Sequence, residues 1–274
     1  MAVTRPSIEL LSIGEELLIG RIANTNAQYL ARRIASLGGR VTRITTIGDD
    51  IDEIALEIKA GLARAPRLIL TTGGLGPTFD DKTLEGIAKG LDRKTALDEE
   101  ALDMLKKRYA ELAAARHQVY EMTPARLKMA MLPEGSSALR NPAGSAPGVI
   151  VRVNDVSVVA LPGVPAEMEA IFETGLADMI RGWSNAFFAE GSFRVEGIGE
   201  SDLAPSIDAA MRENPSVYVK SHPRGQAGGF YVILHLTTSS DTVEKAQEAI
   251  HKTADKLKEL VTAKGGSFTS SADS

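Results

Sequence analysis

The sequence contains no cysteine, and this absence excludes several kinds of site at once. Without thiols, the chain has no disulfide bonds, no zinc–thiolate centre and no cysteine nucleophile. It also lacks any uncharged apolar run of transmembrane length, and residues 1–7 lack the apolar core of a signal peptide. These absences predict a soluble cytoplasmic protein with no membrane partner.

Positive charge is also in deficit, because 31 Lys and Arg residues face 36 Asp and Glu residues, for a formal net charge of -5. Broad nucleic-acid binding needs a basic surface, so a nucleic-acid partner is not expected. An anionic small molecule is compatible with this charge, because backbone N–H groups bind phosphate locally. The 4 histidines show no metal-ligand spacing, which leaves carboxylates as the candidate ligands.

The first part of the chain alternates strand-like and helix-like segments. Strands are predicted at Ile8–Ile13, Val41–Ile47 and Leu68–Thr72, and helices at Asn24–Leu37 and Ile51–Leu62. Strands separated by helices of this length are typical of βαβ units. We therefore predict an α/β fold with a mostly parallel sheet.

The middle of the chain, residues 82–128, has a mainly helical pattern, and Pro124 is expected to open its last helix. A hairpin and one more helix follow, at Val149–Val153, Val156–Ala160 and Ala166–Ile180.

The tail is predicted to be a separate α+β unit, and residues 183–191 are the best boundary. Its strands are predicted at Phe193–Ile198, Val217–Ser221 and Phe230–Thr237, and its helices at Asp202–Met211 and Thr242–Val261. Residues 267–274 are short and polar and are expected to be frayed. The domain limits are thus 1–182 and 192–264.

A glycine-rich loop, residues 73–78, follows the third predicted strand, where open parallel sheets bind their ligands. Glycines allow positive φ and close approach of the backbone to a ligand, and the exposed amides can hold a phosphate or a pterin edge. The loop matches neither a Walker motif nor a dinucleotide fingerprint. A tight structural turn is the alternative. The candidate ligand-binding residues of this loop are Gly73, Gly74, Gly76 and Thr78.

Acidic residues follow all three predicted strands, and the carboxyl ends of parallel strands share one edge of the sheet. These residues are Glu15 and Glu16, Asp49 and Asp50, and Asp80 and Asp81. Carboxylates beside an anion-binding loop repel the ligand unless a cation bridges them, so a hard divalent metal is inferred. Helix capping is the alternative; it is favoured for Asp50, whereas a functional role is favoured for Asp81.

Two later turns are suited to lining a pocket, although each alone is more typical of a structural turn. They are residues 140–148 and 161–165, and their candidate ligand-binding residues are Asn141, Gly144, Pro162 and Gly163. The positive run of residues 106–108 is interpreted as a solvated helix face. In the tail, Lys220, His222 and Arg224 are minor phosphate-contact candidates.

Six motifs carry a resemblance to a known family. They are Gly14-Glu15-Glu16-Leu17-Leu18-x-Gly20, Asn24-Thr25-Asn26, Gly48-Asp49-Asp50, Thr72-Gly73-Gly74-Leu75-Gly76-Pro77-Thr78-x-Asp80-Asp81, Asn141-Pro142-x-Gly144 and Leu161-Pro162-Gly163-Val164-Pro165-x-Glu167-Met168. The first four resemble the molybdopterin-binding fold of the MoaB/MogA type. The full set, over about residues 7–180, is most similar to the N-terminal domain of the CinA (competence/damage-inducible protein A) family. The tail resembles the small KH-like α+β domain that follows it there.

The resemblance implies a three-layer α/β/α fold that commonly forms homo-oligomers. MoaB/MogA-like members bind molybdopterin and support its adenylylation with Mg²⁺, and their essential acidic positions correspond to Asp49 and Asp81 here. In CinA proteins the same domain is associated with divalent-metal-dependent hydrolysis of ADP-ribose. Glu15 stands where the family often has Asp, which lengthens the reach of the side chain. The deamidase domain usually found at the C-terminus of CinA has no room before Ser274, so no deamidase activity is expected.

The leading hypothesis is therefore a pyrophosphatase that acts on ADP-ribose or a related nucleoside diphosphate. The glycine loop would present its amides to the pyrophosphate, and the metal would be Mg²⁺, Mn²⁺ or Co²⁺. The metal ligands would be Asp81 and Asp49, with Asp80 or Glu15. The alternatives are molybdopterin adenylyl transfer and a non-catalytic nucleotide-binding module, so the partner is a nucleotide or a pterin phosphate.

Overall fold

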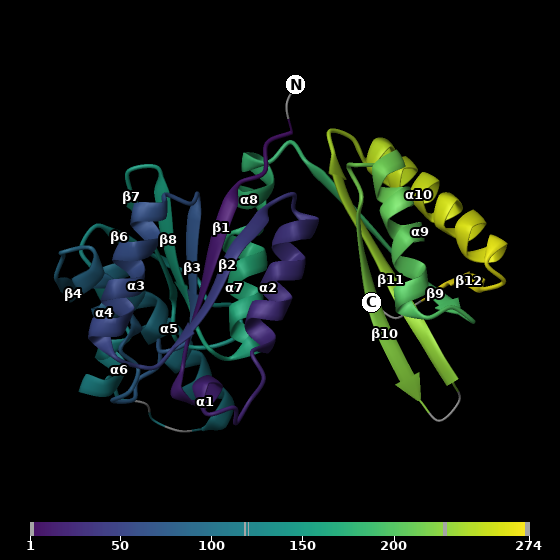
Figure 1. The fold of residues 1–274 in the computed structure, drawn as a ribbon. Coiled ribbons are helices and arrows are strands. Elements are labelled where there is room, and N and C mark those ends of the chain that lie inside the picture. Colours follow the sequence, from purple (N-terminus) through teal and green to yellow (C-terminus); the bar gives the residue numbers. More distant parts are fainter. Residues whose placement is uncertain (1–2, 118, 120, 227–228, 272–274) are drawn as a thin grey trace. The chain divides into compact units, whose positions relative to one another are not determined.

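A six-stranded sheet forms the centre of the first of two compact units (Figure 1). The computed structural model describes residues 3–117, 119, 121–226 and 229–271. The first unit comprises residues 5–35 and 39–183, and the remaining described residues form the second. The sheet of the first unit has the strand order β2 (Arg40–Ile47), β1 (Ser7–Ile13), β3 (Leu68–Thr72), β8 (Val156–Leu161), β7 (Gly148–Val153) and β6 (Ser136–Leu139).

The four strands β2, β1, β3 and β8 run parallel, whereas β7 and β6 are antiparallel to their neighbours, so the predicted mostly parallel sheet is confirmed. β1 ends level with both of its neighbours. Ile13 pairs with Ile47 on β2, and Ser12 pairs with Thr72 on β3. The segments that follow these three strands therefore leave the sheet at the same edge.

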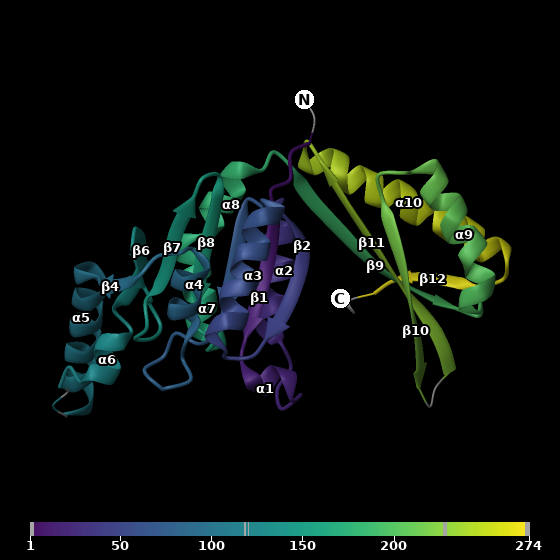
Figure 2. The same cartoon turned by 60° about the vertical axis from the view of Figure 1, so that its left-hand side comes forward.

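Helices cover both faces of this sheet (Figure 2). The helices of this unit are α1 (Glu15–Leu18), α2 (Thr25–Ser36), α3 (Ile51–Arg64), α4 (Thr83–Gly90), α5 (Glu99–Arg116), α6 (Pro124–Lys128), α7 (Pro165–Gly175) and α8 (Ala177–Trp183), of which α1 lies at the end of the strands (Figure 1). One apolar core joins α3, α4 and α5 to one face, through buried side chains such as Ile58, Ile87 and Leu105. Apolar spacing on α2 buries Leu30 and Ile34, and α7 buries Phe172. The three-layer α/β/α architecture is confirmed.

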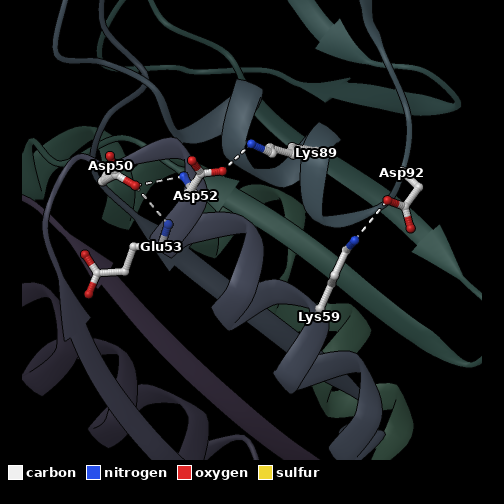
Figure 3. A network of polar contacts seen from close by, with 6 residues as sticks. All are labelled: Asp50, Asp52, Glu53, Lys59, Lys89 and Asp92. Atoms are coloured by element: carbon white, nitrogen blue, oxygen red, sulfur yellow. Dashed lines mark hydrogen bonds and ion pairs between the residues drawn. The ribbon is translucent and has the colours of Figure 1, made fainter.

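The network in Figure 3 explains how α3 begins and how it is joined to α4. The carboxylate of Asp50, the residue before α3, accepts hydrogen bonds from the backbone N–H groups of Asp52 and Glu53, at 2.9 and 3.0 Å. These bonds lower the pKa of Asp50. The predicted capping role of Asp50 is thus confirmed. Two ion pairs then join α3 to α4 and to the residues after it, Asp52–Lys89 and Lys59–Asp92.

Several short elements of the first unit were not predicted. β4 (Thr95–Leu97) and β5 (Met131–Pro133) form a two-stranded sheet, and β6 extends the main sheet. Three or four residues are too few to show a two-residue period. The single helix predicted at residues 166–180 is instead two helices, α7 and α8, which are separated at Leu176.

The second unit is a four-stranded antiparallel sheet with two helices, as predicted for an α+β domain. Its strand order is β10 (Tyr218–Gln226), β11 (Gly229–Ser240), β9 (Phe187–Glu196) and β12 (Ser267–Ser270). Helices α9 (Glu200–Glu213) and α10 (Val243–Ala263) pack against each other and against the sheet (Figures 1 and 2). Their shared core contains Val195, Leu203, Leu234 and Leu257.

Two tail predictions are wrong. β9 begins at Phe187, six residues before the predicted strand, because its first half pairs with the end of β11. Residues 267–270, which were expected to be frayed, form β12 and pair with β9. The ring of Phe268 stacks on Phe193 at a centroid distance of 5.0 Å, which gives this polar strand an apolar anchor. Residues 272–274 lie outside the described part of the chain.

Candidate functional site

A cavity of about 600 Å³ opens at the carboxyl edge of the parallel strands. Its wall brings together segments that are far apart in the sequence: the loops after β1, β2 and β3, one side of α5, and the turns on either side of the β7–β8 hairpin. The predicted site residues that line it are Asp49, Gly73, Gly74, Gly76, Asp80, Asp81, Gly144, Pro162 and Gly163.

The glycines of the loop after β3 are required by close packing. Gly73 has φ 105° and Gly74 has φ 65°, both in the region that favours glycine. A Cβ atom on Gly73 would lie 2.1 Å from the carbonyl oxygen of Ile13, so β1 and the loop touch through backbone atoms. Thr83, which is fully buried at the start of α4, donates its hydroxyl to the carbonyl oxygen of Gly73 at 2.8 Å. The loop is therefore packed between β1 and α4.

Not every amide of the loop is available to a ligand. The N–H of Gly73 donates to the carbonyl oxygen of Leu161 at 3.0 Å, so the expectation that it binds a pyrophosphate needs correction. The N–H groups of Gly74, Leu75 and Gly76 have no acceptor among the residues that the structure describes. Three consecutive amides of this kind are groups with which a loop can bind an anion.

Thr78 organises the acidic pair at the end of the loop. Its N–H and its hydroxyl oxygen lie 2.8 and 2.6 Å from Oδ2 of Asp81, and the hydroxyl also contacts Oδ1 of Asp80. Thr78 does not line the cavity, so its role is to hold the two carboxylates. α4 begins after Lys82 without a side-chain cap, so Asp81 is not a helix-capping residue. The hydrogen bond from Thr78 lowers the pKa of Asp80, and Lys128 and Lys82 lower it further.

Asp49 is the acidic residue whose pKa is raised. Burial is the largest cause, and the nearby carboxylates of Glu16, Asp80 and Asp81 raise the pKa further, whereas a hydrogen bond from the N–H of Glu15 opposes the change. That N–H donates to Oδ2 of Asp49 at 2.9 Å. The cavity is lined by the side chain of Glu16, and Glu15 is not part of its wall. The carboxylates that follow β1, β2 and β3 therefore line the same cavity, as expected for neighbouring parallel strands. They are Glu16, Asp49, Asp80 and Asp81.

Arg108 corrects the interpretation of residues 106–108 as a solvated face. Lys106 and Lys107 are exposed, but Arg108 lines the cavity and is half-buried. Its Nη2 donates to the carbonyl oxygen of Ala143 at 3.1 Å, and its buried Nε has no described partner. The sequence signal was its position three residues after Leu105, which is fully buried.

The remaining wall is polar on one side and apolar on the other. Tyr109, Leu112 and Met129 form the apolar part. On the polar part, Asn141 does not line the cavity, but its Nδ2 donates to Oε2 of Glu167 at 2.7 Å, and Glu167 does line it. Glu167 belongs to one of the six sequence motifs, but no role could be predicted for it from the sequence.

A metal ion at this site would need ligand atoms in addition to those of the protein. In residues 3–117, 119, 121–226 and 229–271, no three His, Cys, Asp or Glu side chains gather closely enough to hold a metal ion by themselves. Mg²⁺ in phosphate sites is typically held by one or two carboxylates, by waters and by the phosphates of the substrate. The four neighbouring carboxylates, with the pKa of Asp49 already raised, fit an ion of that kind and do not fit a metal enclosed by protein ligands.

The other predicted contacts lie elsewhere. Lys220, His222 and Arg224 are on β10 of the second unit, and the described lining of the cavity contains residues of the first unit alone. None of the helices in the described part of the chain has the length and hydropathy of a membrane-spanning segment.

Comparison with known proteins agrees with the motifs. The family model described as "Probable molybdopterin binding domain" matches residues 9–182. A protein from Metallosphaera sedula is 43% identical over 261 residues, which are 95% of this chain and 96% of that one. A protein from Aeropyrum pernix is 41% identical over 266 residues, or 96% and 97% of the two chains.

Among solved structures, "the protein CinA with unknown function" from Thermoplasma acidophilum is 39% identical. It covers 63% of this chain and 98% of its own, with a TM-score of 0.57. The chain therefore belongs to the family of probable molybdopterin-binding domains, with the CinA-like character that its sequence motifs predict.

Proposed function

We propose that this chain is a metal-dependent pyrophosphatase that acts on ADP-ribose or a related nucleoside diphosphate. One observation carries the proposal: three residues of the glycine loop whose N–H groups have no described acceptor line the same cavity as a group of carboxylates. The amides suit the pyrophosphate, and the carboxylates suit a divalent cation that bridges to it. The cavity is of the size that small-molecule sites usually have, about 300–1,000 Å³.

The charge on the wall explains why a cation belongs to the proposal. Five described carboxylates line the cavity with a single described cation, Arg108; the carboxylates are Glu16, Asp49, Asp80, Asp81 and Glu167. A pyrophosphate would add further negative charge, and like charges in a partly buried site repel strongly. We assign the metal to Asp81 and Asp49, with Asp80 beside them. When bound, Mg²⁺, Mn²⁺ or Co²⁺ would polarise the phosphoryl group and help to activate a water molecule.

The residues of the chain have separate tasks in this proposal. Gly74, Leu75 and Gly76 bind phosphate oxygens through their N–H groups, and Thr83 keeps the loop in place. Thr78 fixes the orientation of Asp80 and Asp81 by hydrogen bonds to both carboxylates.

The test is hydrolysis of ADP-ribose, with the products identified in the presence of Mg²⁺, Mn²⁺, Co²⁺ or a chelator. We expect AMP and ribose 5-phosphate to form when a divalent metal is present, and not when the chelator is present. Asp81→Asn should lower kcat by about 100-fold, the order of loss seen when one transition-state-stabilising group is removed. Asp155→Asn, at the tip of the hairpin and outside the described lining of the cavity, is the matched control and should retain activity. Equal AMP formation in chelator would refute the metal role.

Molybdopterin adenylyl transfer is the second candidate, and the family match over residues 9–182 favours it. Both reactions act on a phosphate joined to a nucleotide, so the same loop and carboxylates would serve either. Formation of an adenylylated pterin from ATP, without AMP from ADP-ribose, would establish transfer. Ligand binding without either reaction would indicate a non-catalytic nucleotide-binding module.

Self-association is also part of the proposal, since soluble proteins of this kind commonly form symmetric homo-oligomers. Light scattering during size-exclusion chromatography would measure the mass of the assembly. A monomer at all concentrations would contradict this part without affecting the assigned reaction.

A further inference from the structure

Glu167 lies in the first turn of α7 and is held by a residue from a distant turn. Its Oε2 accepts a hydrogen bond of 2.7 Å from Nδ2 of Asn141, and its carboxylate forms part of the cavity wall. Its Oε1 has no hydrogen-bond partner among the described residues. One oxygen is therefore fixed by the protein, and the other is available to a ligand.

The turn around Asn141 is built to present this carboxylate. Oδ1 of Asn141 accepts hydrogen bonds from the N–H groups of Ala143 and Gly144, at 3.0 and 2.8 Å, and its Nδ2 also donates to the carbonyl oxygen of Ala146. A Cβ atom on Gly144 would lie 1.9 Å from Cδ of Glu167. The turn thus packs directly against the carboxylate and leaves it little freedom to move.

The turn that precedes α7 is also held by a hydrogen bond from a distant residue. Nδ2 of Asn26 donates to the carbonyl oxygen of Gly163 at 2.8 Å, which anchors the turn that leads into α7. A Cβ atom on Gly163 would lie 3.4 Å from Cα of Gly73, so this turn lies against the glycine loop. Glu167 therefore belongs to the part of the wall that adjoins the phosphate-binding amides.

The contacts of Glu167 with the turn hold its carboxylate in place, and the position of this residue in the cavity lining goes beyond that structural role. As the third residue after Val164, Glu167 is placed to cap the start of α7, but the described hydrogen bond of its carboxylate comes from Asn141 instead. In the described part of the chain, Glu167 forms no ion pair. Its carboxylate turns toward the cavity, where it would repel a phosphate but accept a hydrogen bond from a hydroxyl group.

We propose that Glu167 binds the ligand directly, by accepting a hydrogen bond from a hydroxyl group of the sugar that carries the pyrophosphate. This inference rests on the proposed function and narrows its substrate class to pyrophosphates with a free sugar hydroxyl. Asn141 is the positioning residue that holds the carboxylate. Acidic side chains recognise ribose hydroxyls in the same way beside the phosphate loops of other open parallel sheets.

The test compares two ligands that cannot be hydrolysed, α,β-methylene ADP-ribose and methylenebisphosphonate, by isothermal titration calorimetry with Mg²⁺. The second ligand has the two phosphorus groups but no sugar. Glu167→Gln keeps the size of the side chain and an oxygen for Asn141, but removes the charge. It should raise the Kd of the ADP-ribose analogue about tenfold, the effect of losing a charged hydrogen bond, and should not raise that of methylenebisphosphonate.

Two further variants separate direct binding from support of the fold. Asn141→Asp keeps the acceptor for Ala143 and Gly144 but repels Glu167, and it should weaken the ADP-ribose analogue selectively as well. Glu169→Gln, on the same helix but outside the described lining of the cavity, should change neither Kd.

Unchanged binding of the ADP-ribose analogue to Glu167→Gln would overturn the inference. An equal loss for both ligands would also overturn it, because it would show that Glu167 supports the loop and does not bind the sugar. If the wild-type chain binds neither ligand, the inference and the proposed ligand class fail together. The affinity for the ADP-ribose analogue could fall selectively in Glu167→Gln although the wild type does not hydrolyse ADP-ribose. This result would support the inference about Glu167 and would refute only the proposed pyrophosphatase activity.

Discussion

Arg108 carries the single positive charge among the described side chains of the cavity wall. Its guanidinium is held by the carbonyl oxygen of Ala143 and by Glu111, yet its Nε lacks a described partner. Because Arg108 lines the cavity, its guanidinium charge would attract an anionic ligand there, and a charged hydrogen bond to the ligand would strengthen binding by about tenfold or more.

Arg108→Ala should therefore raise the Kd of methylenebisphosphonate about tenfold, whereas Lys107→Ala, from the same helix but exposed, should not change it. Titration calorimetry with Mg²⁺ measures both. Arg108→Lys should restore little of the loss, because an ammonium group does not reproduce the planar set of donors. If both alanine variants raise the Kd equally, Arg108 acts through the overall positive charge of this surface and does not contact the ligand.

Only some of the residues that line the cavity could be predicted from the sequence. Asp49 and Asp81 could be placed in the site, because both follow strands whose ends share one edge. The choice between Glu15 and Glu16 could not be made, because neighbouring helical residues point about 100° apart and the rotation of α1 is set by tertiary packing. Arg108 and Glu167 were missed for the same reason, since their roles depend on contacts with turns far away in the sequence.

At the scale of elements, α2 and α7 are joined by one ionic cluster. Glu173 on α7 accepts a bidentate pair of hydrogen bonds from Arg33 on α2, at 2.6 and 2.8 Å, and one from the hydroxyl of Tyr29 at 2.9 Å. The bonds from Arg33 and Tyr29 lower the pKa of Glu173 despite its partial burial. Burial, and then Glu173, raises the pKa of Tyr29 to about 12, so this hydroxyl is a donor at neutral pH.

The cluster predicts a dependence of stability on pH. Because folding lowers the pKa of Glu173, its contribution is fully present above the unfolded value of about 4.3 and is lost as the pH falls through the folded value. Urea unfolding should therefore show Glu173→Gln less stable than wild type at pH 7, with a difference that shrinks below about pH 4.3. Tyr29→Phe, which keeps the pair with Arg33, should retain most of this dependence. A difference that is constant with pH would contradict the ionic origin.

The start of α3 provides a second test at this scale, within the network of Figure 3. Asp50 accepts two backbone hydrogen bonds, whereas Lys59 is half-exposed and pairs with an Asp92 side chain that is 81% exposed. Exposed ion pairs contribute little, but a lost helix cap leaves backbone donors without an acceptor. Asp50→Ala should thus lower the midpoint of thermal unfolding by a few degrees, and Lys59→Ala should not lower it measurably. The reverse order would contradict the capping role.

Elements could be predicted where their periodicity was long enough. Apart from α1, which is four residues long and was missed, the strands and helices between residues 7 and 72 were recovered to within a few residues, because their apolar and β-branched patterns are long enough to show a period. β4, β5, β6 and β12 were missed, because their pairing depends on partners elsewhere in the chain. The break between α7 and α8 was missed because the apolar pattern continues through Leu176, which is fully buried.

At the scale of the whole molecule, the two units have separate apolar cores. The order of the predicted elements was sufficient to assign an α/β unit followed by an α+β unit. The limits were less accurate, because β9 and β12 extend the second unit beyond residues 192–264 on both sides. The division of the chain matters for function, because the described lining of the cavity lies wholly in the first unit.

This division predicts that the ligand site does not need the second unit. The solved CinA protein from Thermoplasma acidophilum is matched over 98% of its length while it covers 63% of this chain, which is about the extent of the first unit. A fragment that ends at Trp183 should therefore unfold cooperatively and bind α,β-methylene ADP-ribose with the Kd of the full chain. Circular dichroism and titration calorimetry measure the two properties. If the fragment is folded but binds much more weakly, then residues beyond Trp183 contribute to the site, and the cavity wall described above is incomplete.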